Sequence, residues 1–117
     1  MDEPVKEKDA FEYYAEVGRA LASSKRLHVL RCLREREKTV SEILACKSFE
    51  GVPQSTVSPH LALLRQTGLV KARREGTNIY YSLSNPKIME IFQVMDEVVT
   101  GEFSRALRLA KLRGHAH

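Results

Sequence analysis

The sequence lacks the features that would mark a membrane protein or a secreted protein. No apolar run is long enough to span a bilayer. The first dozen residues are too polar and charged for a signal peptide. There are only two cysteines, Cys32 and Cys46, and reduced thiols are the default for a cytoplasmic chain. With 117 residues and no internal repeat, we expect a single cytoplasmic domain that has no membrane partner.

Catalytic signatures are also missing. The sequence shows no nucleophile beside a base, no glycine-rich phosphate loop and no metal triad. The four histidines, at positions 28, 60, 115 and 117, show no ligand spacing that predicts a metal site. We therefore expect no catalytic residues, no metal site and no enzymatic activity.

The charge that is present favours a polyanionic partner. The formal net charge is +4 and the isoelectric point is near 9.2. The last fourteen residues carry four basic side chains and no acid, so this basic tail either continues a helix or contacts DNA. About 43% of the residues are hydrophobic, which gives a modest core, and a partner subunit could cover the apolar surface that remains.

The apolar spacing predicts four helices, a hairpin and a long last helix. The helices are expected over residues 9–23, 25–36, 39 to about 46, and 54 or 55 to 67. Thr39 and Glu42 form a capping-box pattern, and Gly68 suits the end of the fourth helix. Short strands follow over 70–74 and 79–83. The last helix is expected over 86–112, with Pro86 in its first turn and Gly101 as a weak point midway. This order predicts a mainly α fold with a β-hairpin wing, a winged helix-turn-helix.

Pro59 lies in an unusual place, because a proline is costly inside a helix and tolerated only in the first turn. Two alternatives follow. Ser58 is the N-cap and Pro59 the first helical residue, or the helix starts near Ser55 and bends at Pro59.

The helix-turn-helix over 39–67 and the wing over 70–83 would supply the DNA contacts. The second helix of such a motif lies in the major groove with its N-terminal residues toward the bases. A basic wing can clamp the sugar-phosphate backbone. The predicted DNA-binding residues are Gln54, Ser55, Thr56, Ser58, His60 and Arg65 on the helix, and Lys71, Arg73, Arg74, Thr77 and Asn78 on the wing.

Four stretches in the same order carry a family resemblance: GRALASSKRLHVLRCL, TVSEIL, QSTVSPHLALLRQTGLV and ARREGTNIYYSLSNP. Over about residues 11–100 the chain resembles the ArsR/SmtB family of transcriptional repressors. The resemblance implies a homodimer on double-stranded DNA, repression of a small operon and release from a near-palindromic operator when an effector binds. It also implies that helices 9–23 and 86–112 form the dimer interface. Residues 1–8, which lie outside the resemblance, are expected to be flexible. The expected interface residues are Phe11, Tyr14, Ile91, Met95, Val98 and Val99.

The resemblance does not identify the effector. The paired thiolates of many family metal sensors would fall at Thr39-Val40-Ser41, where no cysteine stands. The zinc sites of other members use Asp, His and Glu on the last helices, but here acids at 90, 96, 97 and 102 have no histidine beside them. The turn over 46–51 is also about three residues longer than usual for the family. No cofactor is expected, and a metal or thiol-reactive effector stays open.

The two cysteines are the remaining candidates for an effector site. Cys32 falls where relatives have an apolar residue, so it is either a small core side chain or part of a redox site. Cys46, beside Lys47, is predicted to be partly exposed with a lowered thiol pKa. A bond between them would need Cα atoms within about 7 Å. The alternative function is a protein-interaction module; the basic residues Arg65, Lys71, Arg73 and Arg74 favour DNA.

Overall fold

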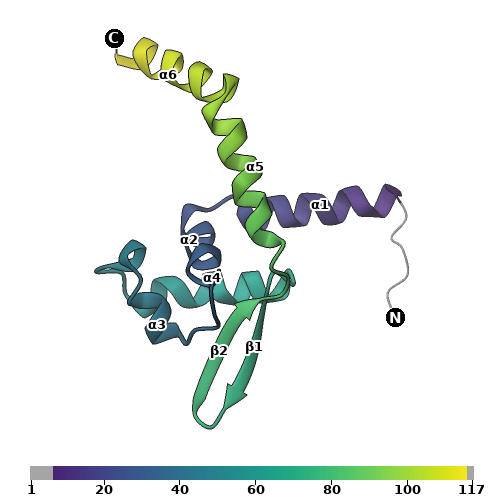
Figure 1. The fold of residues 1–117 in the computed structure, drawn as a ribbon, viewed down its shortest axis with the longest axis vertical. Coiled ribbons are helices and arrows are strands. Elements are labelled where there is room, and N and C mark those ends of the chain that lie inside the picture. The colour runs from purple at the N-terminus through teal and green to yellow at the C-terminus, as the bar shows by residue number, and fades with distance from the viewer. Residues whose placement is uncertain (1–6, 116–117) are drawn as a thin grey trace. The chain divides into compact units, whose positions relative to one another are not determined.

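The computed structural model describes residues 7–115, which fall into two compact units that meet between Asn85 and Pro86. The first unit contains α1 (Glu7–Leu21), α2 (Ser24–Cys32), α3 (Val40–Leu44), the short 3-10 helix η1 (Lys47–Phe49), α4 (Gln54–Gln66), β1 (Val70–Glu75) and β2 (Asn78–Leu83). The second contains α5 (Ile88–Thr100) and α6 (Glu102–His115) (Figure 1). The predicted order of helices and hairpin is confirmed, and the fold of the first unit is a winged helix-turn-helix.

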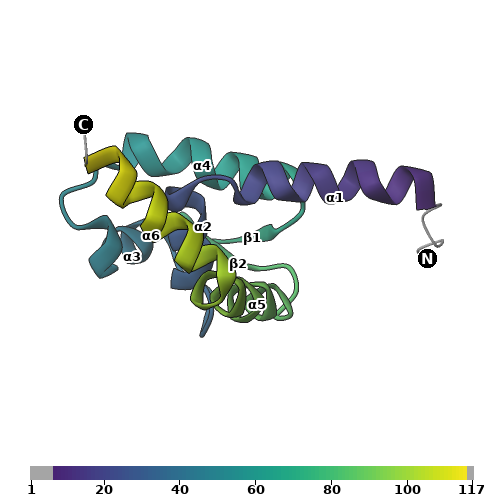
Figure 2. The same ribbon diagram turned by 90° about the horizontal axis from the view of Figure 1, so that it is seen from above.

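Within the first unit, α2 packs against α1 and α4, and α3 packs against α4 and β2 (Figures 1 and 2). The core lies where these helices meet. Its most deeply buried side chains are Val29, Leu30, Ile43, Phe49, Val57, Leu61 and Leu64. Phe49 comes from η1, in the turn between α3 and α4. That turn therefore contributes a large core side chain, which fixes it against the helices.

The helix α2 ends at Cys32, four residues before the predicted end at 36. The N–H of Leu33 donates to the carbonyls of both Val29 and Leu30, at 3.2 Å each, and this bifurcated bond closes the last turn. Leu33 is buried, whereas residues 34–36 are exposed charged side chains with no apolar face to bury. The sequence pattern was compatible with a helix as far as residue 36, but Leu33 is the last side chain of this segment that packs in the core.

The capping box at the start of α3 is confirmed. Thr39 Oγ1 accepts a hydrogen bond from the Glu42 N–H at 3.2 Å, and Glu42 Oε1 accepts one from the Thr39 N–H at 3.0 Å. The bond from the Thr39 N–H is the main cause that holds the pKa of Glu42 below its ordinary value, and Arg36 adds to it. The helix ends at Leu44 rather than near Cys46, because η1 follows within the long turn.

Pro59 lies inside α4, which begins at Gln54 directly after Pro53. Ser58 as the N-cap is therefore wrong, and the alternative of a start near Ser55 is the closer one. Proline has no N–H, so Pro59 cannot donate to the carbonyl four residues earlier, that of Ser55. No side chain caps the first turn either. The start of α4 thus keeps backbone groups that the helix itself does not pair.

The wing is a two-stranded antiparallel hairpin in which Val70 pairs with Leu83 and Glu75 with Asn78. The two-residue tip is Gly76-Thr77, and Gly76 has φ +63°, a conformation that favours glycine. Each strand is one residue longer at the tip than predicted, at Glu75 and at Asn78. Gly68, with φ +80°, ends α4 as the sequence predicted.

The second unit holds two helices where the sequence predicted one over 86–112. Gly101 has φ −97° and ψ −136° and separates α5 from α6. Just before it, Thr100 Oγ1 donates to the carbonyls of Asp96 and Glu97, which competes with continued backbone pairing. The glycine that the sequence marked as a weak point is therefore a break, and Pro86 precedes the helix rather than lying in its first turn. Among residues 7–115, no helix has the length and apolar character needed to cross a membrane.

The capping box gives a test of α3. Thr39→Ala removes the side-chain acceptor for the Glu42 N–H and should lower the free energy of unfolding by about 1 kcal/mol in urea denaturation. Thr39→Ser keeps the hydroxyl and is the matched control, expected to stay near wild type. Equal losses for the two variants would show that the methyl group, not the cap, stabilises this end of α3.

Candidate nucleic-acid interface

A groove lies between the starts of α3 and α4 and the tip of the wing. It has a volume of about 320 Å³ and brings together Gln54 and Ser58 from α4 with Thr77 and Asn78 from the wing. Thr39, Val40, Ser41, Ile79 and Tyr81 line the rest of it. Four predicted contact residues, two from α4 and two from the tip of the wing, thus share one hollow.

Three polar groove residues were not predicted as contacts: Thr39, Ser41 and Tyr81. Thr39 and Ser41 were assigned only to capping and to the first turn of α3. The signal that could have found them is the helix-turn-helix itself, because its first helix crosses the DNA backbone near the start of the second. Tyr81 lies on β2, and only the strand register places it toward α4.

A second hollow of about 470 Å³ continues along α4. It is lined by Ser58, Leu61, Ala62, Arg65, Gln66 and Tyr81. Arg65, a predicted phosphate contact, is exposed here, as is Ser55 near the start of the helix, while Thr56 is half-buried. Gln66 was not predicted, although it follows Arg65 directly and is also exposed.

His60 is placed differently from its neighbours on α4. Its Nδ1 lies 3.3 Å from the guanidinium of Arg26, which also donates to the carbonyls of Ala20 and Arg19 at 2.6 and 3.0 Å. Burial, and then the charges of Arg26 and Lys25, lower the pKa of His60 below its ordinary value. The imidazole is therefore neutral near pH 7 and ties α4 to the junction of α1 and α2. A DNA contact by His60 stays a prediction.

The hairpin register puts the wing arginines on opposite faces, because neighbouring residues of a strand alternate. Arg73 pairs with Tyr80, and Arg74 pairs with Ile79. Arg74 therefore shares its face with Ile79 and Tyr81, which line the groove. Lys71 shares the other face with Arg73. Of the three predicted basic contacts on the wing, Arg74 is the one on the groove side.

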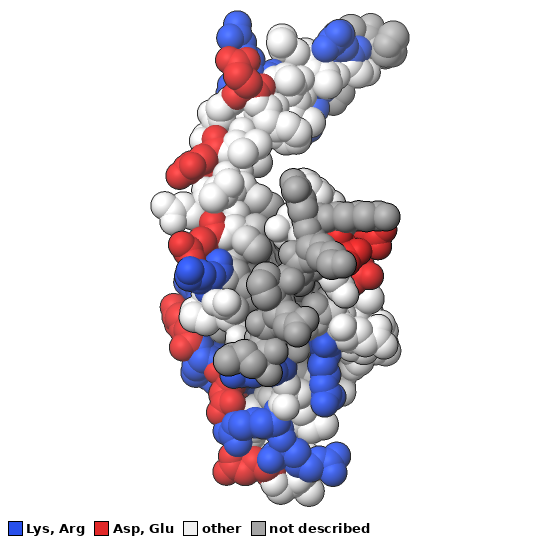
Figure 3. Space-filling view, turned by 90° about the vertical axis from the view of Figure 1, so that its right-hand side faces the viewer, with Lys and Arg blue, Asp and Glu red and all other residues white. Residues whose placement is uncertain are grey.

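Arg73 is engaged within the protein. Its guanidinium forms a two-point contact with Glu37, with Nε 2.8 Å from Oε2, and a third bond of 2.6 Å to Glu75. It also lies over the ring of Tyr80, 4.6 Å from the ring centre. Hydrogen bonding to Arg73 holds the pKa of Glu37 below its ordinary value. Figure 3 shows basic and acidic side chains intermingled at the wing end of the molecule, in keeping with these pairs.

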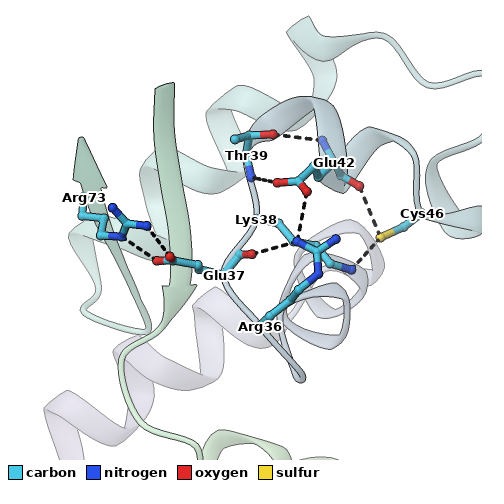
Figure 4. Close-up of polar contacts among 7 residues, drawn as sticks. All are labelled: Arg36, Glu37, Lys38, Thr39, Glu42, Cys46 and Arg73. Carbon is cyan, nitrogen blue, oxygen red and sulfur yellow. Dashed lines mark hydrogen bonds and ion pairs between the residues drawn. The ribbon is translucent and has the colours of Figure 1, made fainter. Parts of the chain in front are cut away.

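The segment before α3 joins the wing through an isolated β-bridge between Lys38 and Tyr81. The Lys38 N–H donates to the Tyr81 carbonyl at 2.9 Å, and the Tyr81 N–H donates to the Lys38 carbonyl at 2.8 Å. With the Arg73–Glu37 pair beside it, this bridge fastens the wing to the helix-turn-helix (Figure 4). Arg73 thus has a structural part in the first unit, and its predicted contact with DNA is untested.

Neither cysteine forms a disulfide within residues 7–115, and both are half-buried. Cys32 is not among the buried core residues. Burial, followed by hydrogen bonding with the Cys46 side chain, raises the pKa of the Cys32 thiol to about 12. Both residues line a cavity of about 270 Å³ between the end of α2 and the turn after α3.

Metal ligands do not gather in the described part of the chain, where no group of three His, Cys, Asp or Glu side chains is close enough to hold an ion. The acids at 90, 96, 97 and 102 are exposed on α5 and α6. The side chains of His115 and His117 lie outside the described residues.

The expected dimer residues are available for a partner. Phe11 and Tyr14 on α1 are 61% and 64% exposed and contact each other edge to face, with ring centres 5.5 Å apart. On α5, Val98 and Val99 are exposed, and Ile91 and Met95 are half-buried. These positions carry large apolar side chains with water-accessible surface, which an interface would cover.

Comparisons with known proteins place the chain in a family. The sequence model described as "Bacterial regulatory protein, arsR family" matches residues 23–72. An HTH-type transcriptional regulator of Methanocaldococcus jannaschii is 34% identical over 92 residues, which is 77% of this chain and 99% of that protein. The chain belongs to the arsR family of bacterial regulatory proteins. It is a winged helix DNA-binding regulator of transcription.

Solved structures agree with this assignment. A homodimeric winged helix-turn-helix DNA-binding domain from Mycobacterium bovis has a TM-score of 0.68 and 32% identity, over 90% of this chain and 95% of that one. Of two further relatives, one is named as a repressor and the other as an activator. The transcriptional repressor SmtB homolog of Synechocystis is 36% identical over 73% of this chain and 62% of its own length. The transcriptional activator HlyU of Vibrio cholerae is 34% identical over 66% and 68%.

The split of the wing arginines gives a test of the interface. Arg74→Gln should weaken DNA binding, because one phosphate contact is lost. The slope of log affinity against log salt concentration should become shallower by about 1. Arg19→Gln on α1, outside the groove, removes the same charge and is the control. Fluorescence anisotropy over a series of salt concentrations measures both. An unchanged salt slope for Arg74→Gln would remove this residue from the interface.

Proposed function

We propose that this arsR-family regulator is a repressor that binds a near-palindromic operator as a homodimer and leaves it when an effector acts. The observation that carries the proposal is the groove in which the start of α4 and the tip of the wing converge. Gln54, Ser58, Thr77 and Asn78 offer hydroxyl and amide groups there, which can meet base edges or phosphates. A repressor is favoured over an activator because the family resemblance in four ordered stretches is to repressors.

The start of α4 supports this role through its backbone as well. Pro53 precedes the helix, and no side chain caps it. The first amide groups of a helix carry partial positive charge and suit a phosphate. Arg65 further along α4 lines the second hollow, and Arg74 lies on the face of the wing that carries Ile79 and Tyr81. Together these groups can hold the backbone of a duplex while the start of α4 enters the major groove.

Dimerisation supplies the second half-site. A twofold dimer repeats the recognition helix, so the two copies contact matching sequences in an operator with the same symmetry. The apolar side chains of α1 and α5 are the surface we assign to this contact. Its residues are Phe11, Tyr14, Ile91, Met95, Val98 and Val99, as the family resemblance implies.

The dimer interface can be tested on α5. The double substitution Met95→Glu and Val99→Glu places two carboxylates one helical turn apart on the apolar face and should give monomers in sedimentation velocity. Gln93→Glu adds the same charge at an exposed polar position and should leave the dimer intact. A stable dimer in the double variant would exclude this face of α5 from the interface.

The repressor function is tested on the DNA upstream of the protein's own gene. We expect anisotropy to show binding that is tight, specific and steeply weakened by salt, since phosphate contacts release counterions. A reporter fused to that DNA should be silenced when the protein is present and active when it is absent. Higher expression with the protein present would identify an activator. Binding with no preference over random DNA would favour the protein-interaction module.

A further inference from the structure

The cavity lined by the two cysteines lies apart from the groove that carries the proposed DNA contacts. Besides Cys32 and Cys46, its lining includes four cationic side chains, those of Arg31, Arg34, Lys38 and Lys47, and one carboxylate, that of Glu35. Arg34 is paired with Glu35 at 3.5 Å, so the carboxylate is already compensated. His28 and Ser48 complete the lining. The cavity therefore joins two thiols with an excess of positive charge.

The two sulfur atoms differ in their surroundings. Lys38 Nζ lies 3.5 Å from Cys46 Sγ, and the Cys46 thiol also lies 3.7 Å from the carbonyl of Glu42 (Figure 4). Cys46 thus has a cation beside the atom that would carry negative charge in a reaction. Cys32 lines the same cavity, and burial, followed by its interaction with Cys46, raises the pKa of its thiol. We assign Cys46 as the first nucleophile of the pair, because Lys38 lies beside its sulfur and a thiolate is the species that attacks.

We propose that Cys32 and Cys46 form a dithiol site that takes small anionic disulfides, is oxidised by them to an internal disulfide, and so links the thiol redox state to DNA binding. The basic lining selects the substrate class: a disulfide that carries carboxylates, such as oxidised glutathione, is attracted, and a cationic one is repelled. The chemistry at the cysteines is independent of the proposed function, whereas the effect on DNA binding rests on that function.

The reaction is a pair of thiol–disulfide exchanges. Cys46 loses its proton, and its sulfur attacks one sulfur of the external disulfide, which breaks that S–S bond and releases one thiolate. Cys32 then loses its proton and attacks the Cys46 sulfur, which releases the second thiolate. The two cysteine protons end on the two released thiols. The protein pair is oxidised by two electrons, and the external disulfide is reduced by two.

The second step is helped by the first. Burial is the largest cause that raises the pKa of Cys32, and the next two, hydrogen bonding with Cys46 and the charge of Cys46, come from the Cys46 side chain. Once Cys46 is in a mixed disulfide, it can no longer carry that charge. Cys32 then ionises more readily beside Lys38, whose charge acts in the same direction. The arrangement thus favours closure of the internal bond over a lasting mixed disulfide.

The route from this site to the groove runs through three consecutive residues (Figure 4). Lys38 contacts Cys46 through its side chain and pairs with Tyr81 of the wing through its backbone. Glu37 before it holds Arg73, and Thr39 after it caps α3 and lines the groove. A Cys32–Cys46 bond would remove the sulfur partner of Lys38 and tie the end of α2 to the turn after α3. Both changes act on the segment that sets the wing against the helix-turn-helix.

The chemistry is tested by intact-mass measurement on the reduced full chain. Oxidised glutathione should lower the mass by about two units, the two hydrogens lost in an internal disulfide. Cys32→Ser should instead gain one glutathione, held at Cys46, and Cys46→Ser should stay unmodified. A lasting glutathione adduct on wild type, or bonds only between chains, would overturn the dithiol site.

The preference for an anionic partner is tested by rate. At low salt, oxidised glutathione should react on the order of tenfold faster than cystamine, a cationic disulfide. Arg31→Gln should slow the reaction with oxidised glutathione but not that with neutral hydroxyethyl disulfide, and Arg19→Gln should change neither. Equal rates for the anionic and cationic disulfides would overturn the role of the basic lining.

The effect on DNA is measured with the same oxidised samples. Anisotropy should show at least about fivefold weaker operator binding for the oxidised wild type, restored by a reducing agent. Cys32→Ser, which cannot form the internal disulfide, is the control for other effects of the oxidant. After treatment with a stoichiometric amount of hydroxyethyl disulfide and re-reduction, it should bind DNA as tightly as the same variant without treatment. An internal disulfide without any change in affinity would overturn the link to DNA binding. If the reduced protein binds no DNA, the proposed function fails, whereas the mass and rate measurements still decide the dithiol site.

Discussion

The arrangement of the first unit depends on the backbone pairing between Lys38 and Tyr81. Two hydrogen bonds of 2.9 and 2.8 Å bridge Lys38 to Tyr81 of the wing, one residue before the cap of α3. This pairing therefore helps to fasten the wing to the helix-turn-helix, together with the contacts of β1 with α4 and of β2 with α3. The Arg73–Glu37 pair braces that pairing from the other face of the sheet. Because both wing and α3 line the groove, its width is set by this junction.

The junction also explains why neighbouring basic residues have different parts. Arg73 and Arg74 are adjacent in the sequence and equal in charge, yet the pleat turns them to opposite faces. One neutralises Glu37 and Glu75, and the other faces the groove side with Ile79 and Tyr81. A count of positive charges on the wing thus overstates the number that is available to DNA. The uncapped start of α4 and the side chain of Arg74 are better placed to contact DNA than Arg73 is.

Local chemistry made much of the fold predictable. The capping box of Thr39 and Glu42, the glycines at 68 and 76 and the alternation of the strands all act within a few residues, so the order of elements followed from them. The errors came where packing overrides local pattern. The helix α2 continues only as far as Leu33 can be buried, and the helix after Pro86 breaks at Gly101. Pro59 was misjudged as a possible helix start, because a capped first turn was assumed where α4 has none.

The sequence by itself determined the family, the helix-turn-helix with its wing and the polar residues at the start of α4, since each depends on residue type and near spacing. Tertiary structure alone decided which of those residues meet. It placed Ser58 in one groove with Thr77 and Asn78, paired Arg73 with Glu37 at the surface, and put Cys32 and Cys46 in one cavity with Lys38. These contacts join side chains from separate elements. Their geometry depends on how the helices and the hairpin pack, which no local pattern specifies.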